Sequence, residues 1–217
     1  MTGANNTPET DNYPISTNGG KTGTCPSANL VDAYENADGT PFDWNSLTPG
    51  DDPYAGRDPR LQYSIVVNDS QWNGRTMQCY DGGADGSGVT QATTTGYYLK
   101  KFLTDGLDLE KNQTSVHSWI LFRYAEILLN YAEAMNEAYG PDTDPFGDGK
   151  TARWAVNEVR GRVGMPPVTA SDETEMRNRI KHERRIELAF EDHRFWDVRR
   201  WGKADAESAL GVPVKGV

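Results

Sequence analysis

The second half of the chain repeats its apolar residues with the period of an α-helix. After Ser118, seven of them fall on one helical face: Ile120, Tyr124, Ile127, Leu128, Tyr131, Met135 and Ala138. Charged and amide side chains occupy the opposite face. Glycine favours the C-terminal end of a helix and proline cannot continue one, so Gly140-Pro141 ends the pattern. The pattern therefore predicts an amphipathic helix from near Ser118 to Gly140.

Two further helices follow. A second helical pattern runs from about Thr151 to Val163 and stops at Gly164. Because only about ten residues connect it to the first helix, the two should form an antiparallel hairpin. A third helix should begin at Ser171 or Asp172, since acidic residues fill its first turn, where the helix dipole favours them.

The inner face of the third helix carries carboxylates where apolar residues are expected. Alternating steps of four and three residues from Met176 reach Glu183, Glu187 and Arg194. Buried carboxylates need partners, and arginines bind them through two hydrogen bonds at once. We therefore expect structural ion pairs among Glu183, Glu187, Arg160 and Arg194.

The first half of the chain lacks long regular patterns. A short amphipathic helix is expected at 29–35, and the closely spaced prolines after it exclude a long element. Residues 61–68 are rich in β-branched side chains and predict a strand. This strand should pair with 75–80 across the turn Asn73-Gly74, which gives a small β-hairpin.

Charge is unevenly distributed along the chain. There are 22 Lys and Arg residues against 32 Asp and Glu, a formal charge of −10, and residues 1–110 alone hold 15 acidic and 6 basic residues. The Asp and Gly of this half are turn-forming residues, so we expect a flexible loop at 81–88 and poor order over 1–28. A net negative chain without a basic run is unsuited to nucleic acid or to an anionic membrane surface.

The sequence shows no membrane span and no targeting segment. Its longest apolar run, Trp119 to Phe122, is far shorter than the roughly 20 residues that span a bilayer. The N-terminus has no signal or transit peptide, which predicts either a cytosolic protein or an excised piece. Cys25 follows no apolar run and is not expected to carry a lipid. Cys25 and Cys79 either form one disulfide or are unpaired thiols, depending on the compartment.

Six strings, taken in their order along the chain, resemble a known family. They are NLVDAYENADGTP at 29–41, GRDPRL at 56–61, TGYYLKKF at 95–102, RYAEILLNYAEAMNEA at 123–138, WAVNEVRGRVGMP at 154–166 and IKHERRIELAFEDHRFWDVRRWG at 180–202. Together they are similar to the C-terminal half of the SusD/RagB family, the surface glycan-binding lipoproteins of Bacteroidetes-type bacteria.

The resemblance implies a mainly α-helical protein with a tetratricopeptide-like helix hairpin, further C-terminal helices and a loop-rich first half. Residues 1–28 would be a flexible segment and 29–217 the C-terminal domain, loop-rich over 29–117 and helical over 118–202. The resemblance also implies a binding protein rather than an enzyme, acting with a TonB-dependent (SusC-like) transporter in polysaccharide uptake. The protein would be surface-exposed on the outer membrane, lipid-anchored through an N-terminal part absent from this chain.

Aromatic residues in the loops are the candidates for a glycan site. Sugars present flat C–H faces and rings of hydroxyls, so such a site needs exposed aromatic rings beside hydrogen-bonding groups. The candidates are Trp72 with its neighbour Asn73, then Trp44, Tyr80 and Tyr54. Trp72 is the first choice because its sequence neighbours are almost all polar. The alternative is that these rings pin the loops to the helical body.

The tryptophans of the helical half have a different expected role. They lie within or at the ends of periodic segments, so we expect them in the core or as helix anchors. They are Trp119, Trp154, Trp196 and Trp201.

Other chemistries lack a complete set of residues. Glu183 and Glu187 are spaced closely enough for a glycosidase acid and base, but the neighbouring arginines should lower their pKa and favour ion pairs. His182 and His193 have no third zinc ligand nearby. The loop at 142–149 imitates a calcium loop at its start and then departs from it. The sequence therefore predicts no metal site, no cofactor and no catalytic residue.

The interpretation that unites these observations is a glycan-binding component of a bacterial outer-membrane nutrient-uptake system, whose acidic, loop-rich half contacts neutral sugars. One alternative is a protein-interaction module, in which the hairpin at 119–163 docks a transporter and no sugar is bound. The other alternative is a glycoside hydrolase.

Overall fold

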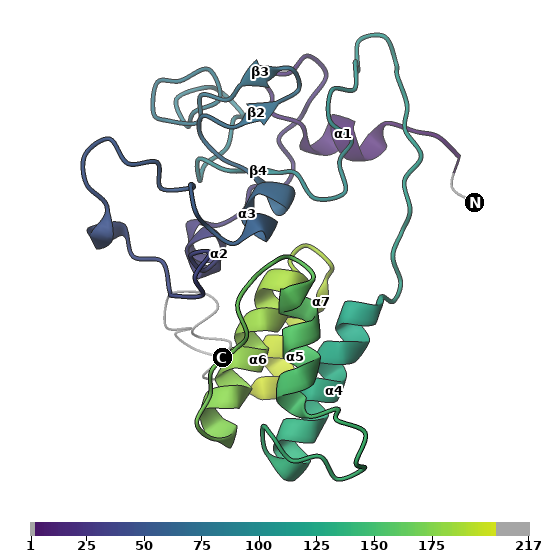
Figure 1. The fold of residues 1–217 in the computed structure, drawn as a ribbon. Coiled ribbons are helices and arrows are strands. Elements are labelled where there is room, and N and C mark those ends of the chain that lie inside the picture. Colours follow the sequence, from purple (N-terminus) through teal and green to yellow (C-terminus); the bar gives the residue numbers. More distant parts are fainter. Residues whose placement is uncertain (1–2, 203–217) are drawn as a thin grey trace. The chain divides into compact units, whose positions relative to one another are not determined.

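The computed structural model describes residues 3–202, which divide into two compact units (Figure 1). The first unit comprises Met1–Tyr34 and Phe42–Leu121, and the second comprises Glu35–Pro41 and Phe122–Val217, both taken within the described residues. The predicted boundary at 117/118 is thus a few residues early and misses the segment 35–41, which belongs to the second unit. The outermost parts of the predicted segments, 1–2 and 203–217, lie outside the described residues.

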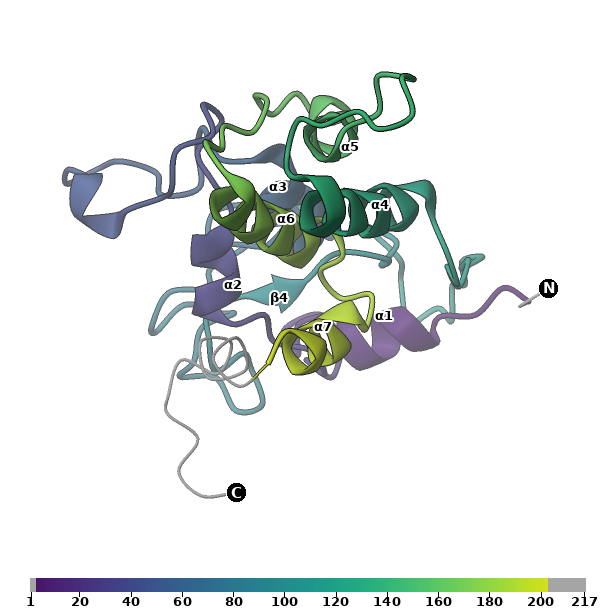
Figure 2. The same cartoon turned by 90° about the horizontal axis from the view of Figure 1, so that it is seen from below.

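The second unit is a helical bundle. Helices α4 (Tyr124–Tyr139) and α6 (Glu173–Glu187) lie side by side, with α5 (Ala152–Gly161) on one side of this pair and α7 (His193–Trp201) on the other (Figures 1 and 2). The apolar faces of α4, α5 and α6 meet in one core, which contains Leu128, Leu129, Ala132, Ala155, Val156, Val159, Val168, Met176, Ile180 and Leu188. The predicted mainly α-helical class is confirmed, and α4 and α5 pack together as the expected hairpin.

Local signals in the sequence set most of the helix ends. Thr151 caps α5 by accepting a hydrogen bond from the Trp154 amide at 3.0 Å. Asp172 caps α6 in the same way, through the Glu175 amide at 2.8 Å. Gly140 ends α4 with a φ of 83°, a conformation that glycine adopts without steric cost. These ends agree closely with the predicted ones.

The start of α4 differs from the prediction. The helix begins at Tyr124 rather than near Ser118, because Arg123 has an extended backbone and its guanidinium binds Glu187 at 2.5 Å and Glu191 at 2.7 Å. Trp119 therefore lies before the helix, in a segment without regular secondary structure, and is 78% exposed. The expectation that Trp119 is a core or anchor residue is wrong.

The predicted third helix is interrupted. After α6, Phe190 and Asp192 adopt positive φ values of 64° and 63°, so the chain turns before α7 begins. His182 and His193 consequently do not share one continuous helix. Trp196 on α7 is 67% exposed, which contradicts its expected place in the core.

The other two tryptophans of this unit are partly buried. Trp154 packs against the core of the bundle. The indole of Trp201 donates a hydrogen bond to Glu133 at 2.9 Å, as a helix anchor would.

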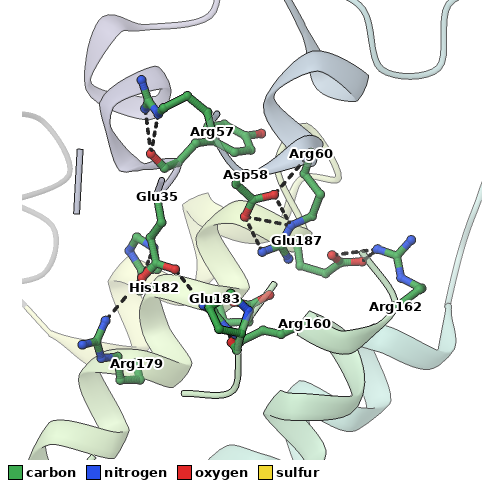
Figure 3. Close-up of polar contacts among 12 residues, drawn as sticks. Glu35, Arg57, Asp58, Arg60, Arg160, Arg162, Arg179, His182, Glu183 and Glu187 are labelled. Carbon is green, nitrogen blue, oxygen red and sulfur yellow. Dashed lines mark hydrogen bonds and ion pairs between the residues drawn. The ribbon is translucent and has the colours of Figure 1, made fainter. Parts of the chain in front are cut away.

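Buried charges tie α5, α6 and the segment 35–41 together (Figure 3). Arg160 binds Glu183 at 3.0 Å and Glu35 at 2.8 Å, and all three side chains are almost fully buried. Glu35 also lies 3.3 Å from Arg179. Burial lowers the pKa of His182 although Glu35 opposes it, so the imidazole is neutral at pH 7.

Glu187 is likewise buried and bound by arginines. Besides Arg123, it accepts from Arg162 at 2.9 Å (Figure 3). Glu183 and Glu187 thus sit in ion pairs away from solvent. Arg194, also expected to pair with carboxylates, places its guanidinium 5.9 Å from the centroid of the Trp201 ring.

The first unit combines short helices and two small antiparallel sheets. Its elements are α1 (Thr7–Asn12), α2 (Ala28–Ala33), a 3₁₀ turn η1 (Trp44–Ser46), α3 (Pro59–Ser64), β1 (Ile65–Val66), β2 (Gln71–Trp72), β3 (Arg75–Thr76) and β4 (Tyr98–Leu99). Strand β1 pairs with β4 and β2 pairs with β3. Their core contains Tyr13, Val66, Trp72, Met77, Cys79, Tyr98 and Leu109.

The predicted hairpin has the right turn, and its second strand contains β3, but its first strand is wrong. Asn73 and Gly74, both with positive φ, join β2 to β3. The segment predicted as the first strand is instead helical over Pro59–Ser64, because Asp58 accepts from the Arg60 amide at 2.9 Å and proline occupies the first turn. Only its last part is a strand, and that pairs with β4.

The N-terminal segment, predicted to be flexible, is fixed to the first unit. Glu9 is fully buried and accepts from the Thr104 amide at 2.8 Å, and His117 lies 2.8 Å from the same carboxylate. Tyr13 is also fully buried and its hydroxyl bonds to the Thr104 carbonyl. The prediction rested on composition alone, which does not register these contacts.

Some further features bear on the sequence expectations. Cys25 and Cys79 are both free. No helix within residues 3–202 is long and apolar enough to cross a membrane.

The loop that imitates a calcium loop, after α4, uses its acid for its own hydrogen bonds. The Asp144 carboxylate accepts from the amides of residues 146, 147, 148 and 149, so its oxygens are already engaged within the loop.

Candidate functional site

A hollow of about 460 Å³ opens on the surface of the first unit. Its lining residues come from five stretches of the chain and are Trp44, Gly50, Asp51, Asp52, Pro53, Tyr54, Asn68, Asp69, Cys79, Tyr80, Thr95, Gly96 and Tyr97. Three of the predicted site residues, Trp44, Tyr54 and Tyr80, therefore lie around one hollow although they are far apart in the sequence.

Contacts along one edge fix the indole of Trp44, while nearly half of the side chain is exposed to solvent. Its indole N–H donates to the Asp32 carboxylate on α2 at 2.9 Å, and Phe42 meets the ring edge-on at a centroid distance of 5.1 Å. The side chain is nevertheless 45% exposed. The indole is thus fixed in orientation and still available to a ligand.

Arg57 anchors the loop that carries Trp44 and Tyr54. Its guanidinium donates to the carbonyls of Val31 at 2.8 Å and Tyr34 at 2.6 Å, at the C-terminal end of α2. It also donates to the Pro53 carbonyl at 3.0 Å and lies 3.5 Å from the centroid of the Phe42 ring. One buried side chain therefore ties the loop to α2.

Tyr54 and Tyr97 form the inner wall of the hollow. Their rings meet edge-to-face at 6.3 Å, and the Tyr54 hydroxyl lies 3.5 Å from that of Tyr97. Burial, together with this hydrogen bond, raises the pKa of Tyr54 well above its ordinary value. The phenol therefore keeps its proton and can act as a hydrogen-bond donor.

Tyr80 stands at the rim and is 53% exposed. The glycine-rich loop 81–88 folds beneath it, since the Gly83 amide donates to the Tyr80 carbonyl at 2.9 Å. A Cβ atom on Gly86 would lie 1.9 Å from that carbonyl oxygen, so only glycine fits there. The expectation of a flexible loop is thus corrected: its glycines permit close backbone packing.

A fully buried carboxylate fixes this loop from within. Asp85 receives two hydrogen bonds from Arg75, at 2.6 and 2.7 Å, one from the Gln78 amide at 2.8 Å and one from the Ser16 hydroxyl. Its carbonyl accepts from Tyr98 at 2.7 Å. Burial alone would raise the pKa of Asp85, but these hydrogen bonds outweigh it and the pKa is lowered. The carboxylate is therefore ionised at neutral pH.

The remaining lining is rich in oxygen acceptors. Asn68 connects two sides of the hollow, because its carbonyl accepts from the Cys79 amide and its NH₂ group donates to Asp69, both at 2.8 Å. Asp52 accepts from the Tyr54 amide at 2.9 Å. A carboxylate has about four acceptor positions, so these acids keep capacity for hydroxyl donors of a ligand.

Two predicted site residues lie elsewhere. Trp72 is only 2% exposed and packs edge-on against Tyr13 at 5.9 Å, so the expectation that it forms an exposed platform is wrong. Asn73 shapes the hairpin turn: its amide donates to Asp105 at 2.8 Å and its side-chain oxygen accepts from Gly106 at 2.9 Å. Both residues have structural partners within the first unit.

The sequence interpretation missed the acidic and amide residues of the hollow. Asp51, Asp52, Asn68 and Asp69 lie in ordinary turn sequences, which do not distinguish them from other loop residues. The signal that was available is the adjacency of Asp51-Asp52 to Tyr54. Within the described residues, no group of three or more His, Cys, Asp or Glu side chains is arranged to hold a metal ion.

Similar proteins share this fold. Residues 1–210 match the model of the SusD family. SusD-like protein P2 of Formosa agariphila is 34% identical over 117 residues, which are 50% of this chain and 22% of that protein. The structure of a SusD-like carbohydrate binding protein from Bacteroides fragilis superposes with a TM-score of 0.73 and 33% identity, covering 89% of this chain and 38% of that one. The structure of a second SusD-like protein from the same species superposes with a TM-score of 0.65 and 37% identity. The match covers 84% of this chain and 37% of that one.

These relatives are much longer than the present chain. It spans less than a third of the curated relatives and less than two fifths of the two solved structures. The family match nevertheless extends over almost the whole chain, and the helical bundle with its loop-rich companion is the architecture that these structures share. The chain therefore belongs to the SusD family.

Proposed function

We propose that the hollow in the first unit binds glycans. The observation that carries this proposal is the pairing of two half-exposed rings, Trp44 and Tyr80, with a lining of carboxylates, an amide and hydroxyls. Aromatic faces stack on the C–H faces of sugars, and the oxygen acceptors receive their hydroxyl protons. The Trp44 ring is held by its contacts with Asp32 and Phe42, so binding does not require this ring to be ordered first.

A similar protein supports this proposal. The Bacteroides fragilis protein that shares this fold is described as carbohydrate binding. Because the present chain covers only part of that protein, the transfer concerns the hollow rather than the whole molecule.

Binding without catalysis is part of the proposal. A glycosidase needs two carboxylates flanking the sugar, one of them protonated as the acid. Glu183 and Glu187, which the sequence singled out, are buried and bound by arginines. This arrangement favours a structural role for both.

The proposed setting is a bacterial outer-membrane uptake system for polysaccharides. There the protein would act as a lipid-anchored protein at the cell surface, with a TonB-dependent transporter. The support is membership of the SusD family together with the proposed glycan site.

The second unit favours one alternative function. Several apolar side chains of α4 and α7 are more than half exposed, namely Tyr124, Ile127, Phe195 and Trp196. Such side chains are suited to contact with another protein. In this alternative the helices dock the transporter and the chain binds no sugar itself.

Two measurements on the same protein separate these functions. A glycan array reports sugar binding, and co-purification with the TonB-dependent transporter reports docking. Binding of an oligosaccharide supports the proposed function, and loss of that binding in Trp44→Ala assigns it to the hollow. A blank array combined with capture of the transporter supports the alternative.

A further inference from the structure

We propose that the hollow selects uncharged glycans and that Asp52 and Asp69 exclude glycans carrying carboxylate or sulfate groups. This inference rests on the proposed function and assigns the expected preference for neutral sugars to particular residues of the hollow. It also assigns a specificity role to two residues that the sequence interpretation did not single out.

The side chains that line the hollow include acids and no bases. Of its thirteen residues, all of them described, three are aspartates and none is Lys, Arg or His. Asp51, Asp52 and Asp69 are all exposed to solvent. Hydrogen bonds from the amide and hydroxyl of Thr48 lower the pKa of Asp51 further, so it stays ionised. The hollow therefore presents negative charge to any ligand that enters it.

The basic side chains of the first unit do not line the hollow. Arg57 binds backbone carbonyls beneath the loop, Arg60 binds Asp58 at 2.7 Å and Arg75 binds Asp85 at 2.6 Å. The lysines contact other side chains. Lys21 forms a salt bridge with Asp11 and Lys111 one with Asp108, while Lys100 and Lys101 lie over the rings of Trp72 and Phe102. Arg57 lies directly behind the lining, since it also donates to the Pro53 carbonyl at 3.0 Å, whereas the contacts of the other six cations are with residues outside the lining.

This distribution has opposite consequences for neutral and acidic sugars. Hydroxyl groups donate to carboxylates through charge-assisted hydrogen bonds, so a neutral sugar gains from the acids. A uronate or sulfate group cannot donate and is repelled by them. One like charge about 7 Å away in water weakens binding roughly 3-fold, and several such charges act together. Added salt screens this repulsion.

A matched ligand pair tests the selection. The probe is the neutral hexasaccharide that binds best among malto-, cello- and mannohexaose, compared with the same sugar after its C6 hydroxymethyl groups are oxidised to carboxylates. Calorimetric titration at 50 mM and 500 mM salt should give weaker binding of the oxidised form, by about 10-fold or more at low salt. The ratio of the two affinities should shrink at high salt.

Variants assign the selection to the two acids. Asp52→Asn combined with Asp69→Asn keeps the side-chain shape and the oxygen that accepts from the Tyr54 amide, and should reduce the neutral-to-oxidised affinity ratio several-fold. Asp11→Asn removes an acid of α1 that does not line the hollow and should leave the ratio unchanged. Equal or tighter binding of the oxidised sugar to the unmodified protein, or a ratio unmoved by the double variant, overturns the inference. Failure to bind any of the neutral sugars overturns the proposed function itself.

Discussion

At the scale of the residue, neighbours in space rather than in sequence decide the role of an aromatic side chain. Trp44 and Trp72 both stand among polar residues in the sequence, yet Trp44 is 45% exposed and Trp72 only 2%. Trp72 lies on β2, whose successive side chains point to opposite faces, so exposed Gln71 precedes buried Trp72. A strand of two residues is too short for this alternation to be read from the sequence.

Replacement of Trp72 should therefore affect stability. Trp72→Ala leaves a cavity beside Tyr13 and should lower the free energy of unfolding by about 3 to 5 kcal/mol. Trp72→Phe should cost only about 1 to 2 kcal/mol, because the buried indole N–H, which has no acceptor among the described residues, is removed with the ring. Urea unfolding measures both, and equal costs for the two variants would contradict this account.

The Asp85–Arg75 pair should make stability depend on pH. Because the folded-state pKa of Asp85 is lowered, its contribution is complete above the unfolded-state pKa near 4 and is lost as the pH falls through the folded-state pKa. Asp85→Asn should cost roughly 3 kcal/mol at pH 7, since it leaves Arg75 without its partner. The difference from the unmodified protein should narrow between pH 5 and pH 3 in urea unfolding. A difference that widens on acidification would refute this interpretation.

At the scale of the element, the helices of the second unit were predictable and the loops were not. Apolar periodicity, Asp172 and Gly140 place the end of α4, the helix α5 and the start of α6 close to where they lie, because these signals act over a few residues. The break after α6 escaped prediction, since phenylalanine rarely adopts the left-handed conformation of Phe190, and an aspartate such as Asp192 is common in other conformations as well. The order of the loop 81–88 escaped too, because it depends on Asp85 and distant partners.

Alanine substitutions of two glycines, Gly86 and Gly74, test whether the loop 81–88 positions Tyr80. Gly86→Ala should distort the loop, since its Cβ would overlap the Tyr80 carbonyl, and should lower both stability, by about 2 kcal/mol, and glycan affinity. Gly74→Ala meets no atom within 4 Å but has a φ of 72°, so it should cost about 1 kcal/mol and leave affinity unchanged. Thermal unfolding and calorimetric titration distinguish these effects. Affinity retained in Gly86→Ala would show that the loop does not position Tyr80.

At the scale of the whole molecule, the chain divides its chemistry between two units. The first unit has 13 acidic and 7 basic residues and holds the hollow, whereas the second has a helical core and buried arginine–carboxylate pairs. The sequence showed this division through charge and periodicity. It could not show that Trp44, Tyr54 and Tyr80 surround one hollow, because the contacts of Arg57 and Asp85 that bring them there join distant segments.

A substitution in the core of one unit should destabilise mainly that unit. Leu129→Ala, in the core of the second unit, should lower local stability by about 2 to 5 kcal/mol and accelerate amide hydrogen exchange in α4 and α5. The matched substitution Leu61→Ala should accelerate exchange in the first unit and leave the helices of the second less affected. Mass spectrometry of native-state exchange reports both. Identical acceleration throughout the described residues in both variants would contradict the division.

Calorimetric titration of Trp44→Ala and Tyr80→Ala with the best-bound oligosaccharide tests the central claim most directly. Tyr63→Ala is the control, because Tyr63 is an exposed aromatic residue of the first unit that does not line the hollow. The account predicts at least a 10-fold loss of affinity in each hollow variant, with a nearly unchanged Tm, and unaltered binding in the control. Affinity retained in both hollow variants would contradict the assignment of the glycan site to this hollow.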